Sequence, residues 1–139
     1  KADLGEHDMN VDFATTVNIL GEDLATQVKQ ASLEIYQFAA DYALQRGIII
    51  ADTKFEFGLD ENNQLTLMDE VLTPDSSRFW SKADYQVGSS PKSFDKQIVR
   101  DYLETLNWDK TPPAPSLPAK IVQQTVDKYQ EVQQLLTQN

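Results

Sequence analysis

The stretch Ile-Ile-Ile-Ala-Asp-Thr-Lys-Phe-Glu-Phe, residues 48–57, decides the fold of this 139-residue chain. Its first half is β-branched and its second half alternates polar and apolar side chains, a pattern typical of a strand. A turn rich in acids and amides follows at 60–63, and residues 64–71 then read as an antiparallel partner strand. We therefore expect a β-hairpin formed by 48–57 and 64–71.

A long amphipathic helix is predicted immediately before this strand. Apolar residues from position 24 onward recur at intervals of three and four, which places them on one helix face. Glu22 and Asp23 suit the positive N-terminal end of the helix dipole, and Gly47 can adopt the left-handed conformation that ends a helix. The face, called the apolar stripe below, consists of Leu24, Val28, Ala31, Ile35, Phe38 and Tyr42.

Two further segments are predicted to lack regular structure. Residues 1–21 are polar and poor in periodic apolar side chains, so we expect an ordered or ligand-facing loop there. Pro74 and the short polar residues around it end the second strand. A loop that carries Arg78, Phe79 and Trp80 is expected to follow.

The C-terminal third of the chain predicts two more helices. Ser93 is expected to cap the first, whose apolar residues step by four from Phe94. The proline-containing segment 107–118 reads as an extended connector, and an amphipathic helix with a glutamine-rich exposed side follows it. An antiparallel hairpin packed with about three helices places the chain in the α+β class.

Composition excludes several classes of function. Twelve basic against 22 acidic residues give a formal net charge of −10, which repels nucleic-acid phosphates. No apolar run approaches the roughly 20 residues that span a bilayer, so no membrane anchor is expected. The chain has no cysteine, which excludes thiolate catalysis and disulfides and fits a cytoplasmic location. Its length favours one domain.

A cluster of charged residues on the predicted hairpin is the first candidate site. Strand geometry places Asp52, Lys54 and Glu56 on one face, with the neighbouring phenylalanines pointing the other way, into the core. Asp69 and Glu70 on the partner strand come back alongside them. Magnesium is usually held by one or two carboxylates together with substrate phosphates, and Glu56 and Asp69 could supply that pair. Spacing alone favours the alternative, an exposed strand face with neighbouring ion pairs.

A second cluster lies in the segment Asp-Ser-Ser-Arg at 75–78. Hydroxyl groups and a guanidinium stand there beside the acidic strand end, and Arg78 suits bidentate recognition of phosphate or carboxylate. A capped turn with an exposed arginine is the alternative. His7 is the single histidine, so neither a histidine-rich metal site nor a Ser-His-Asp triad can form. The glycines are isolated and offer no phosphate-binding loop.

Two long segments are similar to the paired signatures of the SAICAR synthase (phosphoribosylaminoimidazole-succinocarboxamide synthase) family. They are Ile-Ile-Ala-Asp-Thr-Lys-Phe-Glu-Phe-Gly at 49–58 and Leu-Met-Asp-Glu-Val-Leu-Thr-Pro-Asp-Ser-Ser-Arg-Phe-Trp at 67–80. Gly-Glu-His-Asp at 5–8 and Ser-Phe-Asp-Lys-Gln at 93–97, with Arg100 just beyond, also resemble family segments. The resemblance therefore covers nearly the whole chain.

The resemblance implies an ATP-dependent ligase of purine biosynthesis. Such an enzyme joins the carboxylate of carboxyaminoimidazole ribonucleotide to the amine of L-aspartate and splits ATP to ADP and phosphate, through an acyl phosphate. Chemistry of this kind needs Mg²⁺ to neutralise phosphate charge and fixed cations to position anionic substrates.

The resemblance also implies roles for individual residues. Glu56 and Asp69 are the expected magnesium ligands. Lys54 is expected to contact the nucleotide phosphates or the reacting carboxylate, and Asp52 to hold polar groups of the imidazole substrate.

The remaining implied roles concern substrate binding. Ser77 and Arg78 match the segment that grips the ribonucleotide, with Arg78 on its phosphate. Lys96 and Arg100 match a basic helix start that adds phosphate contacts. His7 and Asp8 match a loop near the substrates.

The family places its glycine-rich nucleotide-binding lobe before the point where this sequence starts. The resemblance thus implies that 1–139 is a single C-terminal domain, that the N-terminal ATP-binding lobe is a missing partner, and that the domain alone is inactive. Two other functions stay open: a non-catalytic acidic α+β domain that binds a partner through the helix after Pro118, and a divalent-ion-binding module that needs neither Arg78 nor a nucleotide.

Overall fold

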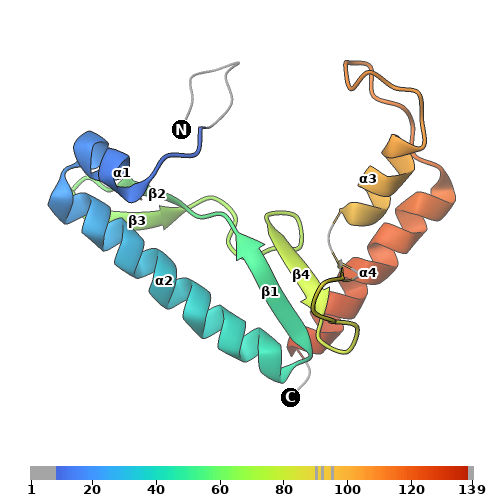
Figure 1. Ribbon diagram of the computed structural model, residues 1–139, viewed down its shortest axis with the longest axis horizontal. Helices are drawn as coiled ribbons and strands as arrows, with labels where there is room; N and C mark the ends of the chain where they lie inside the picture. Colours follow the sequence, from blue (N-terminus) through green and yellow to red (C-terminus); the bar gives the residue numbers. More distant parts are fainter. Residues whose placement is uncertain (1–8, 90, 92, 95, 138–139) are drawn as a thin grey trace.

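The computed structural model describes residues 9–89, 91, 93–94 and 96–137 (Figure 1). Helices precede and follow a run of strands, which is an α+β arrangement and confirms the predicted class. In chain order the elements are α1 (Phe13–Leu20), α2 (Glu22–Gln45), β1 (Ile48–Thr53), β2 (Glu56–Leu59), β3 (Leu65–Met68), β4 (Ser77–Ser81), α3 (Gln97–Glu104) and α4 (Ala119–Thr137).

The strands form two separate two-stranded antiparallel sheets. β1 pairs with β4, with an irregular register between Ile50 and Asp52, and β2 pairs with β3. The predicted hairpin is confirmed as β2–β3, but the prediction of one continuous strand over 48–57 is wrong. β1 ends at Thr53 and pairs with β4, whereas β2 begins at Glu56 and pairs with β3. The chain therefore changes its pairing partner between these two residues.

The loop predicted to carry Arg78, Phe79 and Trp80 is a strand, β4, so that prediction is wrong. Aromatic residues favour strands, and Phe79 is only 2% exposed in this one. The predicted turn before it does form: the Ser77 amide donates to the Thr73 carbonyl oxygen at 3.0 Å. The strand therefore starts directly after the turn.

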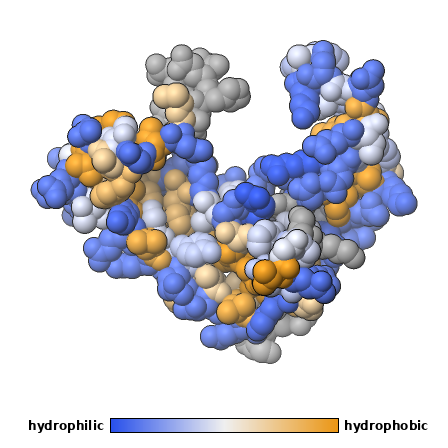
Figure 2. Space-filling model, viewed as in Figure 1, coloured by the Kyte–Doolittle hydropathy of each residue, from blue (hydrophilic) through white to orange (hydrophobic). Residues whose placement is uncertain are grey.

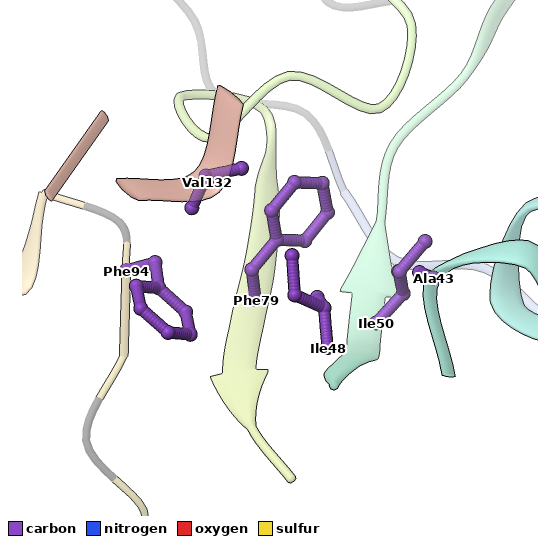
Figure 3. Close-up of a cluster of buried hydrophobic side chains, with 6 residues drawn as sticks. All are labelled: Ala43, Ile48, Ile50, Phe79, Phe94 and Val132. Carbon is purple, nitrogen blue, oxygen red and sulfur yellow. The ribbon is translucent and has the colours of Figure 1, made fainter. Parts of the chain in front are cut away.

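The hydrophobic core surrounds the β1–β4 sheet (Figure 3). Ile48 and Phe79 are its largest fully buried side chains. The C-terminal half of α2 and the C-terminal part of α4 both contribute side chains that pack against this sheet (Figure 1). Full burial of a side chain of this size contributes about 1.5–3 kcal/mol. The buried cluster consists of Ala43, Ile48, Ile50, Phe79, Phe94 and Val132.

The long predicted helix is confirmed as α2, and Gly47 follows it with a φ of 80°. Its predicted apolar stripe, however, is not its buried face. The buried residues of α2 are Ala25 and Ala43, whereas Phe38 is 76% exposed and Tyr42 is 41% exposed. The helix therefore buries only small residues completely and leaves the aromatic end of the stripe exposed.

A short helix occupies part of the predicted N-terminal loop, so the loop prediction over 1–21 is wrong for α1. Asp12 caps α1, because its Oδ1 accepts a hydrogen bond of 2.8 Å from the Thr15 amide. These bonds lower the pKa of Asp12. A capping residue followed by Phe13 and Val17, four residues apart, is the signal that predicts this helix.

Ser93 does not cap a helix, which corrects that prediction. α3 begins later, after Lys96, and has no side-chain cap. Instead, the Ser93 hydroxyl donates to the Phe79 carbonyl oxygen at 3.2 Å, and its backbone forms an isolated bridge with Trp80. Ser93 thus ties the segment before α3 to strand β4.

The C-terminal predictions are confirmed in outline. The segment 107–118 contains neither helix nor strand, and α4 follows it.

Within the described part of the chain, no helix combines the length and apolar character required to cross a membrane.

Candidate functional site

A polar cavity of about 510 Å³ lies where the two sheets, the turn before β4 and α3 meet. It is lined by five carboxylates, four cations and three hydroxyl side chains. The chain has only 12 basic residues, so one third of them gather at this cavity despite the overall acidity. The lining residues are Asp52, Thr53, Lys54, Glu56, Asp69, Glu70, Asp75, Ser76, Ser77, Arg78, Lys96 and Arg100.

Most of the residues predicted for the site therefore line one cavity, although they come from four separate parts of the chain. Asp52, Lys54, Glu56 and Asp69 line it together with Ser77, Arg78, Lys96 and Arg100. The two other predicted residues, His7 and Asp8, lie outside the described residues. The grouping is a finding of the structure, and the roles of the individual side chains stay predictions.

The change of pairing partner between β1 and β2 shapes this cavity. Asp52 lies opposite Arg78 in the β1–β4 sheet, whereas Glu56 lies opposite Met68 in the hairpin. Asp69 follows directly and has a φ of 63°, in the left-handed region, which takes the chain out of β3. Carboxylates of both sheets thereby reach the same cavity.

Arg78 is bound to Asp52 within the chain. Its Nε donates to Oδ1 of Asp52 at 2.9 Å, and its terminal nitrogen makes a second bond to Oδ2. This is the bidentate geometry that arginine also offers to phosphate. The side chains are 55% and 52% exposed, and exposed ion pairs contribute only about 0–1 kcal/mol. The pair is therefore weak enough to open for an anionic ligand.

Two further ion pairs lie in the cavity. The Lys54 ammonium lies 3.0 Å from Glu56 Oε1, and the Lys96 ammonium lies 3.3 Å from Asp75 Oδ1. The side chain of Glu56 is 20% exposed, the lowest value among these charged partners. Glu56 is therefore the best shielded of the paired carboxylates.

A small network of hydroxyl groups forms the floor of the cavity. Ser77 is 4% exposed, and its hydroxyl shares a 2.8 Å hydrogen bond with the hydroxyl of Thr53. Ser76 extends the network, since its hydroxyl accepts from the Thr73 amide at 3.2 Å. Sequence reasoning missed Thr53, because strict alternation places it on the face opposite Asp52. The register of β1 is irregular between Ile50 and Asp52, and Thr53 pairs with Ser77 at the cavity.

The donor set fits a magnesium ion at Glu56 and Asp69. Both groups are hard carboxylate ligands, and the Asp69 carboxylate has no hydrogen-bond partner among the described residues. In that same part of the chain, no three acidic, histidine or cysteine side chains form a metal cluster. Magnesium usually takes only one or two protein carboxylates, with water and substrate phosphates completing its shell.

The two phenylalanines of the decisive stretch point away from the charged cavity, as predicted. They are half-buried rather than part of the core, and they line a second cleft of about 430 Å³ against α2, with Val28 and Leu33. The rings of Phe55 and Phe57 lie 6.3 Å apart in an edge-to-face arrangement.

Comparison with known sequences places these motifs in a family. The sequence profile described as SAICAR synthetase matches residues 1–115, a range that contains every residue of the charged cavity. The chain belongs to the SAICAR synthetase family.

Individual relatives agree with this assignment. The phosphoribosylaminoimidazole-succinocarboxamide synthase of Pasteurella multocida (strain Pm70) is 60% identical over 137 residues, which are 99% of this chain and 48% of the relative. The enzyme of the same name from Haemophilus influenzae (strain Rd) is 61% identical over 137 residues and is covered to 47%. The chain spans about half the length of the curated relatives it matches.

Solved structures of the family share the fold. The SAICAR synthase of Saccharomyces cerevisiae complexed with SAICAR superposes with a TM-score of 0.84 at 47% identity, covering 94% of this chain and 44% of that one. A SAICAR synthetase in complex with ADP gives a TM-score of 0.66 at 26% identity, covering 94% and 46%.

Proposed function

We propose that this chain supplies the substrate- and metal-binding part of an ATP-dependent ligase that makes SAICAR. The reaction joins the carboxylate of carboxyaminoimidazole ribonucleotide to the amine of L-aspartate and converts ATP to ADP and phosphate. The observation that carries the proposal is the charged cavity, where cations and carboxylates of the two family signatures lie together. Cytoplasmic purine biosynthesis is the setting that this activity implies.

The cations of the cavity would bind the anionic groups of the substrates. Arg78 would exchange its bidentate contact with Asp52 for the phosphate of the ribonucleotide, and Asp52 would then be available to polar groups of the imidazole. Lys54 would hold the reacting carboxylate or the nucleotide phosphates. Lys96 and Arg100, at the start of α3, would add phosphate contacts.

The carboxylates of the hairpin would hold the metal. A Mg²⁺ ion bound at Glu56 and Asp69 would neutralise charge on the transferring phosphoryl group. Lys54 would then be released from Glu56 and would point its ammonium at the substrates. Ser77 would grip the ribonucleotide together with Arg78, and its hydrogen bond to the Thr53 hydroxyl would hold this segment in place. His7 and Asp8 are proposed to lie near the substrates, on the resemblance alone.

Activity is proposed to need the other half of the enzyme. This chain matches about half of each relative, and its isolated glycines provide no cradle for a triphosphate. One relative in complex with ADP shows that a SAICAR synthetase binds this nucleotide. We therefore propose that 1–139 is a domain that works together with a separate ATP-binding lobe.

The test is magnesium- and ATP-dependent SAICAR formation from the ribonucleotide and L-aspartate. Two proteins are compared: this chain alone, and this chain joined to the part of the P. multocida sequence that the match leaves uncovered. We expect activity in the joined protein only. Glu56→Gln should reduce kcat by at least about 100-fold there, because a neutral amide is a poor magnesium ligand.

The matched control is Glu61→Gln, the same substitution in the turn of the same hairpin and outside the cavity. It should leave kcat within about twofold, as is usual for exposed positions. Absence of activity in the joined protein would favour a non-catalytic binding domain. Metal binding without any response to the ribonucleotide would favour a simple divalent-ion module.

A further inference from the structure

The apolar stripe of α2 exists in the structure and is only partly covered. Four of its members, Leu24, Val28, Ala31 and Ile35, are half-buried, and none is fully buried. Phe38 is 76% exposed and Tyr42 is 41% exposed. An amphipathic helix normally turns such a stripe toward a packed partner.

The stripe continues into an apolar cleft that opens onto the core. This cleft has a volume of about 210 Å³ and is lined by Ile35, Phe38 and Tyr42 of the stripe together with Ile50 and Phe79 of the sheet. The C-terminal end of α4 closes it, where the Tyr42 hydroxyl donates to the Leu136 carbonyl oxygen at 2.8 Å. The cleft therefore reaches the buried core along one side of α2.

The molecule as a whole exposes more surface than a compact protein of its size. Its accessible area is 10474 Å². A compact chain of 15.7 kDa exposes roughly 7,300 Å². The open arrangement of the α2 arm and the α3–α4 arm is visible in Figure 1, and Figure 2 shows hydrophobic side chains on the surface over α1 and around the lower end of the sheet. Part of this surface is available for burial.

We propose that the stripe and its cleft form the surface against which the other half of the SAICAR synthase chain packs. The inference rests on the proposed function and adds the surface through which the two halves join. The relatives are about twice as long as this chain, so they carry as much protein again to cover this surface. A second copy of this chain is a poor occupant, because two molecules with a formal charge of −10 repel each other.

The test uses this chain co-expressed with the part of the P. multocida relative that the match leaves uncovered. The complex is purified through a tag on this chain, and its Kd is measured by following its mass in a dilution series. We expect a stable complex, and Phe38→Gln should raise its Kd about 10- to 100-fold through the loss of a buried phenyl ring.

Leu44→Gln is the matched control. Leu44 lies on the same helix, is 43% exposed and lines neither the stripe nor the cleft. Its substitution should change the Kd by less than about threefold. Both variants alone should keep the circular dichroism and thermal midpoint of the parent chain, because Phe38 is exposed in it.

Three results would overturn the proposal: no complex with the parent chain, an unchanged Kd for Phe38→Gln, or a dimer of this chain alone that Phe38→Gln dissociates. Assaying the same complex for SAICAR formation separates this inference from the proposed function. A complex that depends on Phe38 but makes no SAICAR would remove the function and keep the docking surface. An active complex whose Kd is unchanged by Phe38→Gln would remove the docking surface and keep the proposed function.

Discussion

The two sheets of this molecule have the same topology and very different surroundings. Both consist of two antiparallel strands, yet β1–β4 buries Ile48, Ile50 and Phe79 to 5% exposure or less, whereas no residue of β2 or β3 is fully buried. A two-stranded sheet is marginally stable alone and needs packing against a helix. The β1–β4 sheet has that packing in full, and the hairpin has it in part.

The difference matters because the charged cavity uses both sheets. Asp52 and Arg78 belong to the well-packed sheet, and Glu56 belongs to the half-exposed hairpin, with Asp69 directly after it. The groups proposed to hold the ribonucleotide are thus fixed by the core. The groups proposed to hold the metal lie on, or directly after, the less deeply packed hairpin. The two halves of the proposed site therefore differ in how firmly the core supports them.

The largest effect is expected where the two sheets differ most, in the burial of an aromatic ring. Phe79→Ala should lower the free energy of unfolding by about 3–5 kcal/mol, since it leaves a cavity in the core. Phe57→Ala in the hairpin removes the same ring from a half-buried position and should cost no more than about 2 kcal/mol. Urea unfolding of both variants gives the comparison. Equal losses would show that Phe57 is packed as firmly as Phe79, so that the two sheets would not differ in packing.

A smaller effect is expected from the hydroxyl pair beneath the cavity. Ser77→Ala leaves the Thr53 hydroxyl without its 2.8 Å partner in a nearly buried position, which should cost about 1 kcal/mol. Ser89→Ala removes an exposed hydroxyl bonded to a backbone carbonyl and serves as the control, with a loss below about 0.5 kcal/mol. Urea unfolding measures both. A loss at Ser77 no larger than at Ser89 would show that the pair does not stabilise the sheet.

The ion pair on the well-packed sheet should matter less for stability than for binding. Arg78→Lys should change the free energy of unfolding by less than about 1 kcal/mol, because the pair with Asp52 is half exposed. The same change removes the bidentate fork and should weaken binding of the ribonucleotide to the joined protein by at least about tenfold. Unfolding in urea and titration calorimetry test the two parts. A stability loss above 2 kcal/mol would make this pair structural, and unweakened binding would remove Arg78 from the site.

The smallest effect is expected at α1, on the hairpin side of the molecule (Figure 1). Hydrogen bonds from Thr15 lower the pKa of Asp12 below its ordinary value of 3.8. The capping charge therefore stabilises α1 above that value, and its contribution disappears as the pH falls through the lowered pKa. Helical circular dichroism at pH 6 and pH 3 should show that Asp12→Ala loses helix mainly at pH 6.

The control for this prediction is Asp12→Asn, which keeps the capping acceptor without the charge. It should retain the helix at pH 6 and show no pH dependence from this position. If the difference between the parent chain and Asp12→Ala were larger at pH 3, the capping interpretation would fail.

Sequence periodicity predicted the direction of side chains better than the pairing of strands. Alternation over 48–57 correctly separated Lys54 and Glu56 from Phe55 and Phe57, whereas Asp52 lines both clefts. It could not show that the chain changes partner after Thr53, because pairing depends on where distant strands lie and not on local pattern. Strand β4 was missed for a related reason: Ser77 is polar yet 4% exposed, so the burial pattern does not follow hydrophobicity.

The candidate site was predicted in part, through two different signals. Spacing grouped Asp52, Lys54 and Glu56 locally, but only the resemblance joined them to Lys96 and Arg100, which lie far along the chain. The internal partners were not predictable from spacing, since the Asp52–Arg78 and Lys96–Asp75 pairs depend on tertiary structure. The same limit explains the apolar stripe, whose periodicity indicated a contact face but not the partner that covers it.

The charge balance of the cavity has a thermodynamic consequence. Its five carboxylates and four cations leave one formal negative charge in excess, so the empty cavity does not attract phosphate through its net charge. A divalent cation bound between Glu56 and Asp69 reverses that sign. Magnesium and phosphate affinities are therefore linked, and each ligand should tighten the binding of the other by the same factor. Without the metal, other anions should bind the cavity only weakly.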